Sequence, residues 1–558
     1  MTNYEIADSF SLLSQLMDIH GENSFKSKSY SAAAFTIEKL PLELSEMEEK
    51  NIASIKGIGA STSQKISELL QTGHLKTLDD LFFSTPPGVV DMLKIKGIGP
   101  KKIHTIWKEM EIESIGELLY ACVENRLKLY KGFGEKTQQN VTDKINFYLK
   151  NMGTHLYVSA EKIAAEIELF LKELFGEKKV LTTGHFKRQI ETVNELEFVI
   201  EADKNYVENC FKKLEDFSPV EQTEDSLTFK TSAGINIKLH PVTKETFLSK
   251  IIETSSPESF VNELKALGID FKNHEDEEGL FRAAGLAFIP PALRDYTGII
   301  ALSKEGRLPD FIKEGDIKGI IHCHSNWSDG SNTIEEMAKA ARQRGMEYLV
   351  ISDHSKSAFY AQGLNEEKIK AQHLYIDELN ESLKPFKIFK SIESDILNDG
   401  NLDYADSVLS GFDLVIASVH SNLKMTQEKA MMRLIKAIEN PFTTILGHMT
   451  GRLLLSREGY PIDHKLIIDA CAANDVVIEL NAHPNRLDMD WRHIAYALRK
   501  NVLISIDPDS HFTEGLDDIK YGILVAQKAL LPKEKNLSSF SLQDFEKFLS
   551  VRKLSKNI

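Results

Sequence analysis

A regular alternation of apolar and polar segments between residues 319 and 511 constrains the fold of this chain more than any other feature. Seven short apolar runs with the character of β-strands each end at, or just before, a cluster of polar residues. Amphipathic, helix-like stretches such as 334–344 and 430–438 lie between the runs. This alternation predicts a β/α barrel or a parallel sheet, in which functional side chains gather at the carboxyl ends of the strands.

Six of the seven polar clusters contain His, Asp or Glu side chains that can bind a metal ion. These side chains belong to His322, His324, Asp329, His354, Glu393, His420, His448, Asp509 and His511. The sixth run, 476–480, ends at Asn481 and supplies no strong ligand. A single buried histidine is usually a hydrogen-bonded core residue, but ligand-capable groups that recur at one end of successive strands indicate a metal centre.

The mixture of imidazole and carboxylate groups favours zinc, manganese or iron, whereas magnesium alone would favour sites made only of oxygen ligands. Nine candidate ligands are too many for one ion. Neighbouring divalent ions can stabilise both the attacking and the leaving oxygen of a phosphoester displacement. Hydrolysis of a phosphoester is therefore the predicted chemistry.

The motifs that carry these residues resemble the metal-ligand series of the PHP (polymerase and histidinol phosphatase) superfamily. The matching segments are His322-x-His324, Ser352-Asp353-His354-Ser355, Glu393, Ser418-Val419-His420-Ser421, Gly447-His448 and Asp509-x-His511. The resemblance implies a distorted (β/α)7 barrel that holds up to three ions, expected to be Mn²⁺ or Zn²⁺. It groups His322, His324, Glu393 and Asp509 around one ion, Glu393, His420 and His448 around a second, and Asp329, His354 and His511 around the third.

Catalytic roles are expected for four residues near these ions. Glu393 would bridge two ions, and Asp509 and His511 would complete the cluster. Arg452 follows His448 closely, so that its guanidinium could steady a phosphate together with Arg457 and Arg486. The alternative for each arginine is an ordinary surface ion pair.

The rest of the composition is that of an ordinary water-soluble protein. A chain of 558 residues with 42% hydrophobic content is expected to form three to five domains. No apolar stretch is long enough to span a bilayer and no secretory leader is recognisable, so we expect a cytoplasmic protein with no membrane partner. The net charge of −16 argues against a globally basic nucleic-acid binder. The lysine-rich stretch 94–108 has no acidic residue and is a local exception.

A glycine motif occurs three times in the first part of the chain, at 55–59, 95–102 and 130–134. Two glycines around one apolar residue form a tight turn that presents backbone N–H groups at the start of a helix, where a phosphate binds without base readout. The three copies resemble helix-hairpin-helix DNA-binding motifs. DNA-backbone contacts are thereby implied for Gly57, Gly59, Lys96, Gly97, Gly99, Lys101, Lys102, Gly132 and Gly134.

The order of these elements resembles that of the bacterial X-family DNA polymerases with a C-terminal PHP domain, over essentially the whole chain. Segment 23–34 is similar to the start of a small lyase-type domain, 184–192 to the opening of the polymerase palm, and 285–294 to the end of the thumb. The implied fold is multidomain: an α-helical helix-hairpin-helix region, an α+β nucleotidyltransferase-like palm with a thumb, and the PHP barrel. The implied domains are 1–80 (lyase-like, first hairpin), 81–152 (fingers-like, further hairpins), 153–245 (palm), 246–300 (thumb), 301–317 (linker) and 318–558 (PHP).

The palm departs from the family pattern at its metal-binding carboxylates. Glu195-Leu196-Glu197 stands where the family has Asp-x-Asp, and Lys238 stands where it has a third Asp. The formal charge of the cluster changes from −3 to −1, counting two glutamates against one lysine, which weakens the attraction for two Mg²⁺ ions. His185 and the turn 253–256 also differ from the pattern. We therefore expect weak or absent template-directed synthesis, with slow Mn²⁺-supported synthesis as the alternative.

The resemblance implies a DNA-repair protein that acts mainly as a metal-dependent 3′–5′ exonuclease or phosphoesterase on gapped, nicked or 3′-ended duplex DNA, which it contacts through the backbone. Incision at abasic sites would be a further activity. Lys65 matches the family position of a Schiff-base lysine for lyase chemistry, and an ordinary exposed helix lysine is its alternative reading. An active gap-filling polymerase in base excision repair and a non-catalytic DNA-binding scaffold remain open as alternatives. A small-molecule phosphatase is disfavoured by the three glycine hairpins.

Overall fold

The computed structural model describes residues 1–38, 40, 43–95, 97–149, 153–272 and 274–558. These residues divide into two compact units, one of 1–123 with 127–148 and the other of 124–126 with 149–558. Of the helices in this part of the chain, none combines the length and the apolar character that a bilayer span requires.

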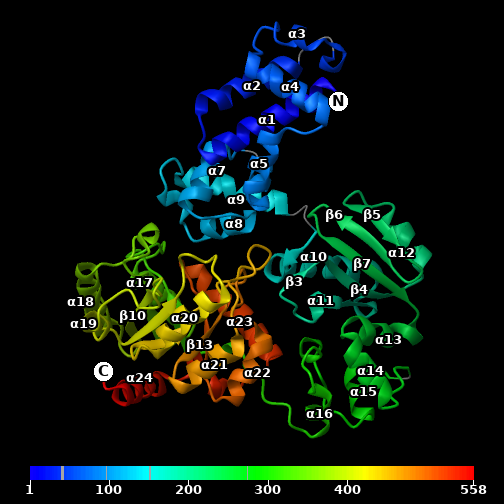
Figure 1. Cartoon of the computed structure of the whole chain (residues 1–558). Coiled ribbons are helices and arrows are strands. Elements are labelled where there is room, and N and C mark those ends of the chain that lie inside the picture. The colour runs from blue at the N-terminus through cyan, green and yellow to red at the C-terminus, as the bar shows by residue number, and fades with distance from the viewer. Residues whose placement is uncertain (39, 41–42, 96, 150–152, 273) are drawn as a thin grey trace. The chain divides into compact units, whose positions relative to one another are not determined.

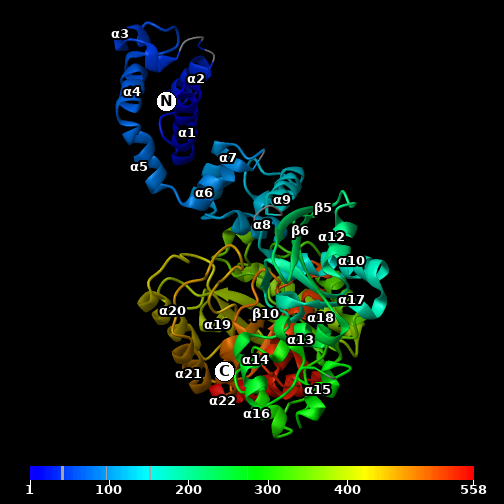
Figure 2. The ribbon, with the colours of Figure 1, turned by 90° about the vertical axis from the view of Figure 1, so that its right-hand side faces the viewer.

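The described residues of the first unit form helices joined by short loops. The helices are α1 (Asn3–His20), α2 (Ser24–Glu38), α3 (Glu49–Ile52), α4 (Ala60–Thr72), α5 (Lys76–Ser84), α6 (Pro87–Asp91), α7 (Pro100–His104), α8 (Ile115–Val123) and α9 (Glu135–Leu149). Thr2 caps the start of α1, and Gly21 ends it in the left-handed region with φ of 72°. The helices α1 and α2 lie side by side (Figures 1 and 2), with the ring centroids of Phe10 and Tyr30 5.8 Å apart.

The second unit begins with a mixed five-stranded sheet in the order β2-β4-β7-β6-β5. The strands are β2 (Val180–Thr183), β4 (Glu195–Glu201), β7 (Asn236–Val242), β6 (Leu227–Thr231) and β5 (Phe217–Gln222), and only β4 and β7 pair in parallel. Helices α10 (Tyr157–Phe175) and α12 (Lys204–Phe211) pack on this sheet (Figure 1). The core between the sheet and these helices includes Phe198 and Phe229 from the strands and Phe211 from α12. The strand residues reach it because alternate residues of a strand point to one face of the sheet.

Short elements flank this sheet. They are the two-stranded pair β1 (His155–Leu156) and β3 (Thr192–Val193), helix α11 (Gly184–Lys187), and the helices that follow the sheet, α13 (Lys244–Thr254), α14 (Glu258–Ala266), α15 (Glu277–Ala283) and α16 (Ile299–Lys304). Arg294 is fully buried among the later helices, where it pairs with Glu277 and donates to Ser255. A buried guanidinium is tolerated here because its donors are satisfied.

The C-terminal part is a nearly closed barrel of seven parallel strands in sequence order. The strands are β8 (Gly319–Cys323), β9 (Tyr348–Ile351), β10 (Lys387–Asp395), β11 (Leu414–Ser418), β12 (Thr443–Leu446), β13 (Val477–Asn481) and β14 (Ile504–Asp507). The helices of this part are α17 (Ile334–Gln343), α18 (Glu366–Leu383), α19 (Asp406–Leu409), α20 (Gln427–Glu439), α21 (His464–Ala473), α22 (Trp491–Arg499), α23 (Ile519–Lys528) and α24 (Leu542–Lys556). The predicted fold class, including the (β/α)7 barrel, is confirmed.

Two apolar layers stabilise the barrel. One lies between the strands and the surrounding helices, and the other fills the interior with residues such as Val350, Phe389 and Ile416. Phe545 and Leu549 of α24 belong to the interior cluster. Phe389 and Glu393 are four residues apart on β10 and therefore share the inward face, so apolar residues occupy one end of the interior and polar residues the other.

A buried lysine joins the barrel to the preceding part of the second unit. Lys528, at the end of α23, is fully buried, and its Nζ donates to the carbonyl oxygens of Arg188 at 2.8 Å and Ala292 at 3.0 Å. The same atom lies 3.2 Å from Oδ2 of Asp295, which also pairs with the Arg188 guanidinium. Burial lowers the pKa of Lys528, and the Asp295 carboxylate opposes this shift. The ammonium thus satisfies three acceptors from two segments, one at Arg188 and the other at 292–295.

Replacing this lysine tests how firmly the barrel is joined to the rest of the unit. We expect Lys528→Met to lower Tm by at least about 5 °C in calorimetry, because breaking a buried charge network costs roughly 3–5 kcal/mol. Lys520→Met is the control, since Lys520 pairs with Glu161 while its side chain is 41% exposed, and exposed pairs contribute less than about 1 kcal/mol. Equal Tm losses in the two variants would contradict a special role for Lys528.

Candidate functional site

The candidate metal ligands lie at the carboxyl ends of the barrel strands or in the loops that follow. His322 and Glu393 are within β8 and β10, and the other seven follow β8, β9, β11, β12 and β14. None of the nine side chains is more than 10% exposed. The strand ends therefore converge on one buried polar cluster, as the alternation of segments predicted.

Glu393 occupies the centre of this cluster. Its Oε1 atom lies 3.3 Å from His322 Nε2, 3.1 Å from His420 Nε2 and 3.0 Å from His448 Nε2. Its Oε2 atom lies 2.9 Å from His354 Nδ1 and 3.7 Å from His324 Nε2. One carboxylate thus faces five imidazoles, which is the arrangement expected of a bridge between neighbouring cations.

A second carboxylate, Asp509, lies beside the two histidines at the end of β8, His322 and His324. Its Oδ1 atom is 3.1 Å from His324 Nε2 and 3.4 Å from His322 Nε2. Asp509 adopts a positive φ of 52°, and His322 adopts one of 59°. Left-handed backbone is uncommon for residues other than glycine and clusters at functional sites.

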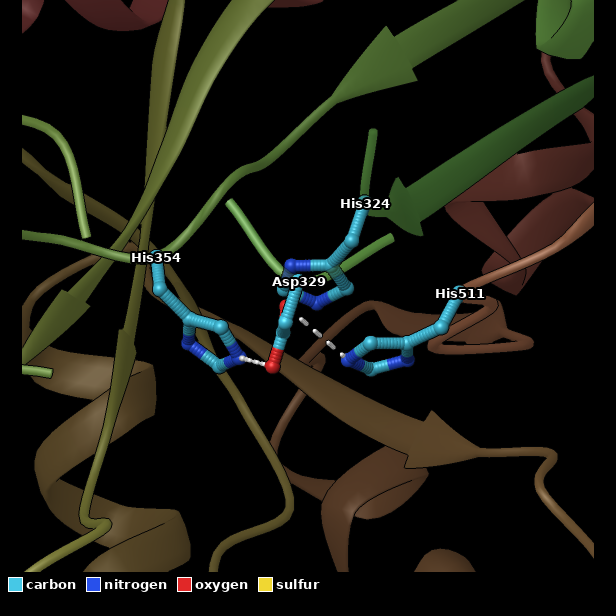
Figure 3. A group of neighbouring side chains, drawn as sticks. All are labelled: His324, Asp329, His354 and His511. Atoms are coloured by element: carbon cyan, nitrogen blue, oxygen red, sulfur yellow. Dashed lines mark ion pairs between the residues drawn. The ribbon is translucent and has the colours of Figure 1, made fainter. Parts of the chain in front are cut away.

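The third carboxylate, Asp329, lies between His354 and His511, with the ring of His324 close by (Figure 3). Asp329 Oδ2 is 3.6 Å from His354 Nε2, and Asp329 Oδ1 is 3.5 Å from His511 Nε2. One ligand atom from each of these four residues lies within 4.8 Å of the others. The four side chains could therefore surround one ion.

Distances between the candidate ligand atoms group these residues differently from the grouping that the family resemblance implies. By mutual distance, His324 joins the Asp329, His354 and His511 group and also forms a group with His322 and Asp509. Glu393 and His420 group with His354. The assignment of individual residues to three separate ions stays a prediction.

The chemistry of the donor set fits metal ions. His322 Nε2, Asp329 Oδ2 and His511 Nε2 are buried and make no hydrogen bond to any described residue. Burial raises the pKa of Glu393, but the surrounding His420, His322 and His354 hold it well below its usual value. Buried ionised carboxylates need positive charge beside them, and divalent cations supply it.

Several buried partners orient these ligands, and two of them, Asp395 and Glu479, were not identified from the sequence. Asp395 pairs with His420 Nδ1 at 2.5 Å, and Glu479 pairs with His322 Nδ1. Asp353 accepts hydrogen bonds from Ser325 N at 2.7 Å and Gln372 Nε2 at 2.6 Å, which anchors the loop leading to Asp329. A charged residue inside an apolar strand, as Glu479 is in 476–480, was the available signal for one of them.

The guanidinium of Arg452 is already engaged inside the protein. Nη1 donates to Asp490 Oδ2 at 2.7 Å, Nε donates to the Arg486 carbonyl at 3.0 Å, and Nη2 donates to the Leu487 carbonyl. Arg486 lies nearer the cluster, with Nε 3.7 Å from Asp509 Oδ2. The phosphate-steadying role of Arg452 stays a prediction that requires this network to rearrange.

The three glycine motifs form the tight turns that their sequence predicts. The first glycine of each, Gly57, Gly97 and Gly132, has a φ between 93° and 98°, which favours glycine. The apolar residue between the glycines is buried, and the second glycine (Gly59, Gly99 or Gly134) directly precedes α4, α7 or α9. Lys101 and Lys102 lie in α7, whereas Lys96 lies outside the described residues. The turns suit backbone contact, and the DNA contacts themselves stay predictions.

The acidic residues of the mixed sheet face basic side chains. Glu195 and Glu197 lie on β4, and Lys238 lies on the adjacent β7, where it is the Cα partner of Glu197. Lys238 Nζ is 3.4 Å from Glu195 Oε1, and His240 Nε2 is 3.0 Å from Glu197 Oε2. Lys238 was identified from the sequence. His240 was not, because its proximity to Glu197 depends on the register between β4 and β7.

Lys65 lies in α4, where its Nζ donates to Thr77 Oγ1 at 2.6 Å. This contact leaves the predicted lyase role untested.

Comparison with known proteins agrees with this arrangement. Residues 1–75 match a helix-hairpin-helix domain, 89–146 a SAM-like helix-hairpin-helix tandem and 321–483 the PHP domain. The chain is 32% identical over 556 residues to the DNA polymerase/3′-5′ exonuclease PolX of Bacillus subtilis, covering 96% of each chain. It is also 28% identical over 169 residues to a protein named probable phosphatase in Caldanaerobacter subterraneus, covering 29% of this chain and 60% of that protein. A further protein of that name, in Acetivibrio thermocellus, is 26% identical over 246 residues, covering 42% of this chain and 95% of that protein.

His324 offers a direct test of the cluster because it belongs to two of the groups. We expect His324→Ala to weaken Mn²⁺ binding by more than about 10-fold. The reason is that losing a residue that only supports a metal ligand already weakens metal binding about 10–100-fold. Equilibrium dialysis with mass spectrometry would give the Mn²⁺ content per chain. His373→Ala is the control, because His373 packs against Phe412 with ring centroids 4.8 Å apart and takes no part in the cluster. Unchanged Mn²⁺ binding in His324→Ala would contradict the assignment.

Proposed function

The chain belongs to the DNA polymerase/3′-5′ exonuclease PolX family, and from this premise we propose that it is a DNA-repair protein acting mainly as a metal-dependent 3′–5′ exonuclease or phosphoesterase through its PHP domain. The observation that carries the proposal is the buried cluster around Glu393, in which one carboxylate faces five imidazoles. The helix-hairpin-helix domains and the kinship to a DNA polymerase indicate DNA binding.

The nine ligands would hold up to three ions, for which Mn²⁺ or Zn²⁺ suits the mixed donor set best. When bound, such ions lower the barrier to phosphoester hydrolysis by stabilising negative charge on the reacting oxygens. In this proposal Glu393 would be shared by two of these ions, Asp509 and His511 would complete the ligand set, and Arg452 or the nearer Arg486 would steady a phosphate. Burial of the side chains supports the proposal, because it excludes bulk water and strengthens electrostatic interactions.

The substrate in this proposal is gapped, nicked or 3′-ended duplex DNA, held through its backbone. The glycine turns support this choice, because backbone N–H groups at helix starts bind phosphates without reading sequence. The same proposal includes base excision repair in the cytoplasm, incision at abasic sites and lyase action by Lys65. It also includes the domain boundaries that were predicted from the sequence.

A 5′-labelled primer annealed to a gapped template tests the main activity. With Mn²⁺ and no nucleotides, we expect the full chain to shorten the primer from its 3′ end. The double variant His322→Ala with His324→Ala should lose at least about 10³-fold in rate, because Glu393 and Asp509 lose two neighbouring imidazoles. His373→Ala serves again as the matched histidine control. Shortening that survives in the double variant would refute the PHP domain as the nuclease.

We also propose that the palm has lost most or all of its polymerase activity and does not hold Mg²⁺. The pairs Lys238–Glu195 and His240–Glu197 support this, because each glutamate already has an internal cationic or protonatable partner. A metal ion would have to displace these partners and would meet the positive charge of Lys238. An active gap-filling polymerase is the competing possibility.

Primer extension in the nuclease-deficient double variant tests the palm without interference from shortening. We expect little or no extension with Mg²⁺ and all four nucleotides. Restoring three aspartates through Glu195→Asp, Glu197→Asp and Lys238→Asp should raise incorporation at least about 10-fold, because it restores the charge that attracts two divalent ions. Lys230→Asp, on the adjoining strand β6, is the charge-matched control. Efficient extension by the unmodified palm would show that the glutamates still assemble a polymerase site.

A further inference from the structure

Glu479 is a buried carboxylate that touches two candidate metal ligands from different strands. It lies on β13, the one barrel strand for which the sequence indicated no ligand, and its side chain is fully buried. One oxygen, Oε1, pairs with His322 Nδ1. The other, Oε2, accepts the backbone N–H of His448 at 2.6 Å.

The contact with His322 determines which ring nitrogen faces the cluster. When Nδ1–H donates to Glu479, the opposite nitrogen, Nε2, is left as the coordinating atom. Nε2 lies 3.3 Å from Glu393 Oε1 and 3.4 Å from Asp509 Oδ1. The φ of 59° at His322 departs from strand geometry, so the strand alone does not orient this ring.

The contact with His448 acts on the backbone instead of the ring. Glu479 Oε2 holds the N–H of the residue whose Nε2 lies 3.0 Å from Glu393 Oε1. Asn481, two residues further along β13, donates to Glu479 Oε2 at 3.2 Å and to Asp509 Oδ2 at 3.0 Å. A single carboxylate therefore connects ligands of β8 and β12 and, through Asn481, a ligand that follows β14.

We propose that Glu479 is a positioning residue for the nuclease site: it holds His322 in the tautomer that coordinates through Nε2 and fixes His448 relative to Glu393. The inference rests on the proposed nuclease function for its catalytic consequence, although its effect on metal binding is independent of that function. Asp395 gives a contrast, because it pairs with His420 Nδ1 and so supports a single ligand. Glu479 supports two ligands, His322 and His448, whose Nε2 atoms both approach Glu393 Oε1.

Glu479→Gln is the informative substitution, since an amide has one acceptor oxygen where the carboxylate has two. Either His448 N–H loses its acceptor, or an NH₂ group faces His322 Nδ1 and favours the wrong tautomer. We expect Mn²⁺ affinity of the full chain to fall about 10–100-fold in equilibrium dialysis. Nuclease activity should recover at saturating Mn²⁺, a rescue that general damage to the fold would not permit.

Asp507→Asn is the matched control, because Asp507 is a fully buried carboxylate on the neighbouring strand β14 that bonds Ser505 and Ser538. Its Mn²⁺ affinity should stay within about 3-fold of the unmodified chain, well below the effect of a ligand partner. Glu479→Asp provides a second variant if Glu479→Gln folds poorly; its shorter side chain reaches only one of the two partners and should weaken Mn²⁺ binding as well.

Unaltered Mn²⁺ affinity in both Glu479 variants would overturn the proposal, and so would equal losses in Asp507→Asn and Glu479→Gln. Failure of the proposed function would look different. In that case the unmodified chain would bind Mn²⁺ but leave labelled DNA intact, while the dialysis comparison between Glu479→Gln and Asp507→Asn would still report the positioning effect.

Discussion

The structure of the polar end of the barrel depends on how the buried negative charge of Glu393 is stabilised. A carboxylate with no exposed surface is unfavourable unless positive charge or hydrogen bonds surround it, and five imidazoles face this one. Those histidines come from strands and loops that are spread over more than a hundred residues of the chain, from 322 to 448, so the charge is stabilised only when the barrel is assembled. The left-handed backbone at His322 and Asp509 is consistent with a site in which ligand placement outweighs local conformational preference.

The half-buried glutamates of the mixed sheet have a different environment. Lys238 on the adjacent strand compensates the charge of Glu195, and His240 on the same strand lies within hydrogen-bonding distance of Glu197. The barrel cluster has more histidines, but three carboxylates lie among them, and several of its buried atoms make no hydrogen bond to any residue that the structure describes. The two arrangements support the proposal that metal-dependent chemistry takes place in the barrel and not at the mixed sheet. The barrel is joined to the preceding part of the second unit through the buried Lys528 network.

The glycine turns show how little sequence is needed to specify a local structure. Gly57, Gly97 and Gly132 each adopt a positive φ, and the buried residue that follows anchors the turn. Because this geometry depends on a few neighbouring residues, it could be predicted reliably from a short motif. The same local character explains why the motif repeats at different places in the helical region without a change of form.

The sequence by itself determined the alternation of strands and helices, the metal-binding residue types at the strand ends, and the three glycine turns, because each of these depends on residues close together in the chain. The alternation alone left a barrel and an open sheet as alternatives, the family resemblance predicted the barrel, and the tertiary structure confirmed that the seven strands form a nearly closed one. The contacts of Glu479, His240 and Lys528 could not be predicted from the sequence. Their partners, His322, Glu197 and Asp295, lie 157, 43 and 233 residues away, and only strand register and helix packing bring such side chains within hydrogen-bonding distance.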